Sequence, residues 1–214
     1  MSQRLLDGDL RRAEILFGLI MVLTFTCSLG VAGAGREDVR VMLIGALGCN
    51  LAWGIIDGVF YLMNSLAEKG GGLLKLQAVR RAEDPRLAQQ LIAESLPAVV
   101  ASVMEPAELE TIRQRLRQLP EPGRDATGLD RKDWLSALAV TLLVFLTTFP
   151  VALPFLFMQE ATTALRVSNA IAIAMLFIIG WLYGRGIGRS PWLFGVSMVL
   201  LGAALVAIAI ALGG

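Results

Sequence analysis

Asp57 is the residue of this chain with the clearest potential for chemistry. It lies within residues 41–63, an otherwise apolar stretch that is long enough to cross a lipid bilayer. A carboxylate near the centre of a membrane helix costs about 2.5–3.5 kcal/mol to insert, so such residues usually face a cavity, a bundle interior or a partner. Asp57 is therefore the first candidate for a site that binds a cation or a proton.

Helical spacing gives Asp57 polar and small neighbours on one face of its helix. Residues three and four apart share a face, and here they are Asn50, Gly54, Asp57, Gly58, Tyr61 and Ser65. Such a stripe suits two roles. It can pack closely against another helix, since Gly54 and Gly58 have the GxxxG spacing, or it can line the path of an ion or proton. Both interpretations stay open at this stage.

A divalent metal would need further oxygen or sulfur donors near Asp57. In the preceding apolar stretch, one face carries Met21, Thr24, Cys27 and Ser28. Thioether and thiol groups beside a carboxylate suit transition metals better than magnesium or calcium. Together with Asn50 and Asp57 these residues are the candidates for an ion or proton pathway, although each also fits ordinary helix packing.

Besides Asp57, a second group of metal candidates lies in the polar middle of the chain, where Glu94, Met104, Glu105 and Glu108 could gather as a metal-collecting cluster. Glu105 and Glu108 also open a predicted helix, where acidic side chains suit the helix dipole without any metal. The chain has no histidine, which excludes imidazole ligands and Ser-His-Asp triads. No convincing nucleophile–base pair is present, so neither an enzyme nor a tightly bound cofactor is expected.

The elements that must position these residues are membrane helices. The 214 residues are 56% hydrophobic and 17% charged, and stretches of about 20 apolar residues suffice to span a bilayer. Five such stretches occur, at residues 15–34, 41–63, 135–158, 164–183 and 192–212. We therefore expect an all-α polytopic membrane protein with five transmembrane helices, in contact with the lipid bilayer, and a small helical cytoplasmic insert between helices 2 and 3.

The predicted domains are residues 1–67, 68–132 and 133–214. Glycines 70–72 are expected to end the second helix, with a separate short helix at 73–82. Asp84 and Pro85 are typical of a helix start, and Pro97 is expected to bend or break the helix at 86–104. A further helix is expected at 105–119. In the third membrane helix, Pro150 and Pro154 predict a kink.

The arginine and lysine residues predict the orientation of the chain. Eleven lie between the second and third apolar stretches, whereas none follows the last one. The positive-inside rule then places the N-terminus and residues 68–132 in the cytoplasm and the C-terminus outside. The net charge of +1 gives no indication of nucleic-acid binding.

Three sequence segments resemble the vacuolar iron transporter (VIT) family, as in a divergent bacterial-type member. They are GCNLA at 48–52, FPVALPF at 149–155 and GVSMVLLG at 195–202. The resemblance implies a homodimer in the bacterial inner membrane that exports divalent metal ions, Fe²⁺ or Mn²⁺, from the cytosol, with possible proton coupling. A non-transporting dimeric membrane scaffold, whose cytoplasmic helices bind a partner, is the alternative.

The family implies an Asp-Gly pair in the first membrane helix. The chain has Phe17-Gly18 at the best-matching position, so the carboxylate of this pair is missing. Asp57 in the second helix is the candidate that would compensate for it.

Overall fold

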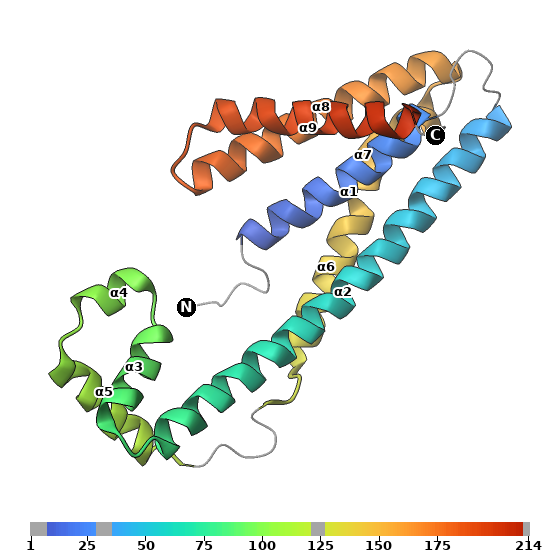
Figure 1. The fold of residues 1–214 in the computed structure, drawn as a ribbon. Helices are drawn as coiled ribbons and strands as arrows, with labels where there is room; N and C mark the ends of the chain where they lie inside the picture. Colours follow the sequence, from blue (N-terminus) through green and yellow to red (C-terminus); the bar gives the residue numbers. More distant parts are fainter. Residues whose placement is uncertain (1–7, 29–35, 121–126, 212–214) are drawn as a thin grey trace. The chain divides into compact units, whose positions relative to one another are not determined.

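The computed structural model describes residues 8–28, 36–120 and 127–211, and the elements in these ranges are helices, with no strand among them (Figure 1). This confirms the all-α class for the described part of the chain. The helices are α1 (Gly8–Ser28), α2 (Arg36–Arg81), α3 (Pro85–Glu94), α4 (Ala98–Val103), α5 (Pro106–Gln118), α6 (Arg131–Leu146), α7 (Thr148–Phe157), α8 (Ala161–Gly186) and α9 (Pro191–Ala211).

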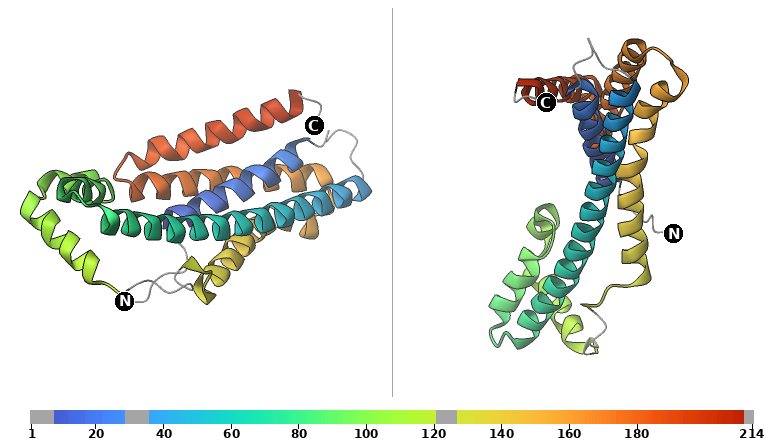
Figure 2. Two further views of the ribbon diagram at one scale, coloured as in Figure 1. Left: turned by 60° about the horizontal axis from the view of Figure 1, so that its bottom comes forward. Right: turned by 90° about the vertical axis from the view of Figure 1, so that its right-hand side faces the viewer.

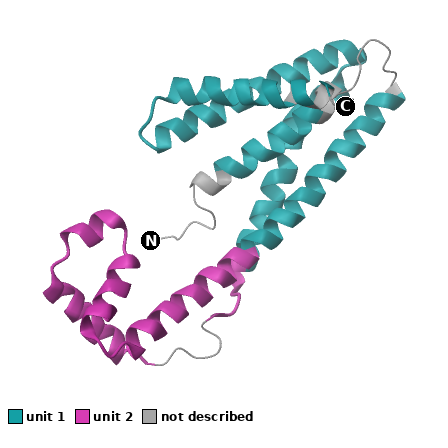
Figure 3. Cartoon of the chain, viewed as in Figure 1, with its two compact units in different colours: residues 1–61, 134–214 teal, residues 62–133 magenta. Residues whose placement is uncertain are grey.

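The chain divides into two compact units (Figure 3). Unit 1 contains residues 1–61 and 134–214, and unit 2 contains residues 62–133. The long helix α2 contributes its first part to unit 1 and its last part to unit 2. Each unit has its own cluster of buried apolar side chains.

Unit 1 is built around α1. The helices α8 and α9 pack against each other, and α1 contacts both of them as well as α7 (Figure 2). The core contains Leu19 and Val22 of α1 together with Leu176 of α8, which are all fully buried. This arrangement places one face of α1 in the apolar core and leaves another face for contact with α2.

The outer surface of unit 1 is apolar. On α2, Leu51, Ile55 and Val59 lie opposite the polar stripe, and each is about half exposed. Apolar side chains outside and polar ones inside are typical of a helix in contact with lipid. Within the described residues, three helical segments are long and apolar enough to cross a membrane: Glu37–Arg81, Arg131–Phe157 and Ala161–Gly186. They coincide with the second, third and fourth predicted spans.

The third of the predicted spans is interrupted at Thr147, between α6 and α7. Pro150 explains the interruption, because a proline lacks a backbone N–H and its ring displaces the carbonyl four residues earlier, here that of Leu146. The hydroxyl of Thr147 donates to the carbonyl of Val144 at 2.6 Å. Pro154 lies inside α7 and is buried.

Glycines 70–72 do not end the second helix, so that prediction was wrong. The helix α2 continues to Arg81 and includes the segment predicted as a separate helix at 73–82. Each glycine costs about 1 kcal/mol of helix propensity, but the end of α2 buries Val79 beside Ala88 and Ile92 of α3. Burial of this apolar face outweighs the local preference of the glycines.

The other helix ends in unit 2 follow the sequence signals. Asp84 caps α3 by accepting a hydrogen bond from the backbone N–H of Arg86 at 2.8 Å, with Pro85 in the first turn. Of the two outcomes expected at Pro97, the structure shows the break: the segment predicted at 86–104 forms two helices, α3 and α4. The predicted helix at 105–119 is confirmed as α5.

Candidate functional site

Asn50 anchors the polar stripe of α2 inside unit 1. Its side chain is fully buried, and its Nδ2 donates to the carbonyl of Gly18 in α1 at 3.2 Å and to the hydroxyl of Thr148 in α7 at 2.5 Å. The Oδ1 of Asn50 is buried and has no hydrogen-bond partner among the residues that the structure describes. A buried carbonyl oxygen without a donor costs about 1–3 kcal/mol, and it is available to a cation or water.

The two glycines of the stripe pack against α6 of the same chain. A Cβ added to Gly54 would lie 2.7 Å from the carbonyl oxygen of Thr141, and one added to Gly58 would lie 2.6 Å from the Thr141 hydroxyl. The Thr141 hydroxyl also donates to the carbonyl of Gly54 at 2.8 Å. The GxxxG spacing therefore serves contact within the chain, which does not favour the stripe as the dimer seam of a scaffold protein.

Asp57 meets a second carboxyl group, that of Glu14 in α1. The two carboxyl groups lie close enough to interact electrostatically. Glu14 was not among the predicted site residues, because it directly precedes the first apolar stretch and follows two arginines. Its position could have indicated it: Glu14 lies one turn before Phe17-Gly18, the pair at which the family resemblance implied a carboxylate.

Two carboxyl groups at close range can form a hydrogen bond to each other only when one of them holds a proton. A pair in that state would carry one proton and one negative charge. The Oδ2 of Asp57 is buried and receives no hydrogen bond from an N–H or hydroxyl group in the part of the chain that the structure describes. The site thus combines two neighbouring carboxyl groups with an acceptor oxygen that has no donor among the described residues.

The contacts between α1 and α2 have a consistent antiparallel register. Glu14 meets Asp57, the rings of Phe17 and Trp53 are 5.6 Å apart, and Gly18 accepts the hydrogen bond from Asn50. At 1.5 Å per residue, Asn50 is about 10 Å along the helix from Asp57. Two unpartnered oxygens therefore lie on the same side of α2, two helical turns apart.

The other predicted pathway residues lie further along α1. Met21 is partly buried, and the hydroxyl of Thr24 donates to the carbonyl of Ile20 in its own helix at 2.9 Å. The side chains of Cys27 and Ser28 lie outside the described residues. The structure thus brings Asn50 and Asp57 to one face of α2 and adds Glu14.

The predicted acidic candidates of unit 2 have structural partners. Glu105 and Glu108 form the capping box of α5, in which the backbone N–H of Glu105 donates to the Glu108 carboxylate at 2.8 Å. Glu94 accepts from the amide of Gln90 at 2.9 Å, and Met104 directly follows α4. Across the ranges that the structure describes, no three His, Cys, Asp or Glu side chains gather where they could hold a metal ion.

Glu110 shows how firmly an acidic side chain of this unit can be held by its neighbours. The Arg113 guanidinium, together with the amides of Gln89 and Gln114, lowers the pKa of Glu110 to about 2. The Nη2 of Arg113 lies 2.6 Å from the Oε1 of Glu110. Glu110 is therefore ionised and paired at neutral pH.

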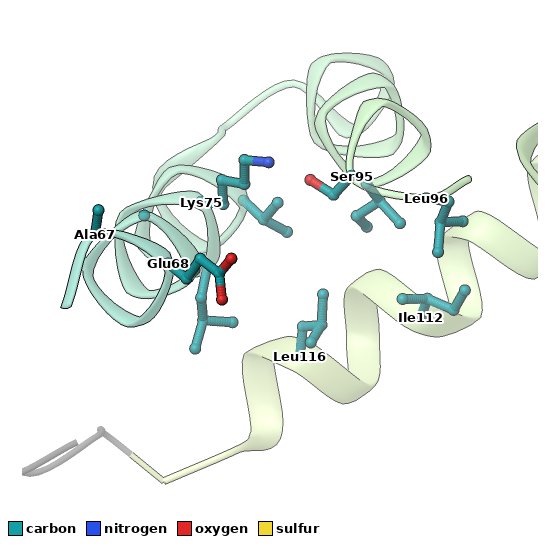
Figure 4. A pocket seen from close by; sticks show the side chains of 12 residues that line it. Ala67, Glu68, Lys75, Ser95, Leu96, Ile112 and Leu116 are labelled. Carbon is teal, nitrogen blue, oxygen red and sulfur yellow. The ribbon is translucent and has the colours of Figure 1, made fainter. Parts of the chain in front are cut away.

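Unit 2 also contains an open cavity of about 760 Å³ between α2, α3 and α5 (Figure 4). Its walls are mainly apolar, and Glu68, Lys75 and Ser95 supply polar groups. The predicted acidic candidates do not line it. A single carboxylate in an apolar cavity is a poor metal site, so the carboxyl pair of unit 1 remains the stronger candidate.

Comparison with known proteins agrees with this membrane architecture. The chain is 24% identical over 213 residues to Vacuolar iron transporter 1 of Oryza sativa subsp. japonica, an alignment that covers 92% of this chain and 81% of the relative. The profile of the VIT family matches residues 74–214. This match covers most of the chain, including α6 to α9, and it indicates a membrane metal-ion transporter. The chain belongs to the VIT family.

Proposed function

We propose that this protein exports divalent transition-metal cations, Fe²⁺ or Mn²⁺, from the cytosol in exchange for protons, and that the Glu14–Asp57 pair is the exchange site. The proposal is carried by one observation: carboxyl groups of α1 and α2 lie close together, and the buried Oδ2 of Asp57 has no hydrogen-bond donor among the described residues. The family of the chain and the name of its rice relative support a metal ion as the substrate.

The chemistry of exchange follows from the charge of the pair. A divalent cation that binds both carboxylates displaces the shared proton and is neutralised by the two negative charges. When the metal replaces the proton, the Oδ2 of Asp57, which has no hydrogen-bond donor among the described residues, becomes a ligand of the metal ion. The Oδ1 of Asn50, two turns away, is a second oxygen along the same face, and Met21, Thr24, Cys27 and Ser28 would line the remaining path.

The proposed arrangement in the membrane has five spans. They are α1, α2, the interrupted pair α6 and α7, α8 and α9. The N-terminus and unit 2 would lie in the cytoplasm and the C-terminus outside, in a bacterial inner membrane, with two copies forming a homodimer. The excess of arginine and lysine between the second and third spans supports this orientation.

Flux measurements test the role of the carboxyl pair. Purified protein in liposomes is assayed for uptake of Fe²⁺, Mn²⁺, Co²⁺ and Zn²⁺, with and without a pH gradient. Asp57→Asn and Glu14→Gln are each expected to lower metal flux at least a hundredfold, because each removes one of the two charges that neutralise the cation. Glu37→Gln is the matched control, since it removes an exposed carboxylate from the first turn of α2.

Full flux in both Asp57→Asn and Glu14→Gln would show that the pair is not the exchange site. An absence of metal flux in the unmodified protein, in an assay where a known metal carrier works, would contradict the transport function itself.

A further inference from the structure

The turn between α8 and α9 lies beside the start of α1 and carries two arginines. No Asp or Glu follows Glu160 in the chain, whereas Arg185 and Arg189 both lie at this turn. Both arginines are exposed. Gly188 adopts a left-handed φ of 69°, which allows the chain to reverse between them. The turn therefore presents two guanidinium groups with no carboxylate nearby on α8 or α9.

Aromatic rings hold the guanidinium groups at this end. Arg185 lies over the ring of Trp181, 5.5 Å from its centroid, and Arg12 of α1 lies over the ring of Tyr183 at 5.9 Å. Trp192, at the start of α9, is 68% exposed. Tryptophan and tyrosine beside arginine are typical of the level at which lipid headgroups meet the hydrocarbon core.

An apolar cavity of about 260 Å³ opens beneath these groups, between α1, α8 and α9. Arg12 and Tyr183 form its polar part, while Leu16, Ile179 and Met198 supply apolar walls. Arg12 is held close to the backbone of α8, because a Cβ added to Gly186 would lie 2.7 Å from its Nη2. A cation is thus fixed at one end of an apolar space.

We infer that this end of unit 1 is a binding site for an anionic phospholipid of the bilayer. The phosphate would contact Arg185 and Arg189, and one acyl chain would enter the cavity along Leu16 and Met198. Basic pockets between membrane helices on the cytoplasmic side suit such headgroups. The apolar cavity favours a lipid over free phosphate as the source of the anion.

Native mass spectrometry of the delipidated full-length protein tests this site, with phosphatidylglycerol and phosphatidylcholine as probes. Phosphatidylglycerol is expected to bind at least tenfold more tightly than phosphatidylcholine. Arg185→Gln with Arg189→Gln should weaken phosphatidylglycerol binding about fivefold for each arginine removed. Arg166→Gln is the matched control, because Arg166 is exposed on the same helix α8 near its other end.

Ala13→Phe tests the cavity separately from the charges. Ala13 lines the cavity and is exposed, so a larger side chain there would fill the space without disturbing the core. It is expected to lower phosphatidylglycerol binding at least fivefold with all arginines intact. Equal binding of the two lipids, equal weakening by Arg166→Gln, unchanged binding in Ala13→Phe, or full competition by inorganic phosphate would each overturn the inference.

Discussion

At the scale of single residues, the proposed sharing of a proton by Glu14 and Asp57 would link metal binding to pH. Asp57 alone would offer one negative charge to a divalent cation, whereas the pair would offer two after its proton leaves. Interacting carboxyl groups titrate as a unit, so neither residue would act independently of the other. Metal and proton would therefore compete for the same oxygen atoms.

This competition predicts proton release on metal binding. Calorimetric titration of the purified protein with Mn²⁺ at neutral pH, in buffers of different ionisation enthalpy, should show about one proton released for each cation bound. Binding should weaken as the pH falls, because protons then occupy the pair. Asp57→Asn and Glu14→Gln should abolish the release, whereas Glu37→Gln should retain it. Release of no proton by the unmodified protein would exclude exchange at this pair.

At the scale of elements, the site depends on close contact between α2 and α6. Gly54 allows this contact, because any Cβ at that position would meet the backbone carbonyl of Thr141 at 2.7 Å. At Gly48, six residues earlier on α2, an added Cβ would have no atom within 4 Å. A methyl group would therefore clash with α6 at Gly54 and would fit without a clash at Gly48.

Substitution of these two glycines by alanine tests the packing of α2. Gly54→Ala is expected to destabilise the protein by about 1–3 kcal/mol, because the helices must separate. Gly48→Ala should be neutral or stabilise it by up to about 1 kcal/mol through its better helix propensity. The melting temperatures of the variants in detergent give the measurement, and equal effects of the two changes would contradict close packing at Gly54.

The sequence predicted the elements better than it predicted their contacts. Asp84, Pro97 and the Asp57 stripe gave correct signals because capping, missing donors and helical spacing act locally. The helix end predicted at glycines 70–72 was wrong, because α2 is stabilised beyond them by burial of Val79 in unit 2, and this burial depends on residues of other helices. Glu14 was missed because its importance arises only when α1 lies against α2.

At the scale of the whole molecule, cysteine labelling tests the proposed spans and their orientation. In a background without the native thiols (Cys27→Ser, Cys49→Ser), single cysteines replace Gln159 between α7 and α8 or Arg189 between α8 and α9. A membrane-impermeant thiol reagent added to intact cells should label the cysteine at 159. It should label the one at 189 only after permeabilisation. The reverse pattern would invert the proposed orientation.

Exchange of one metal ion for one proton at Glu14 and Asp57, as proposed, would also make transport depend on the membrane voltage. Exchange of one divalent cation for one proton moves a net positive charge across the membrane, so the membrane voltage enters the energy balance. An interior-negative potential opposes the exit of that charge by about 2.3 kcal/mol per 100 mV. Export through this pair would therefore slow as the cytoplasm becomes more negative, and metal efflux in an energised cell would need either a large cytosolic excess of metal or a steep inward proton gradient.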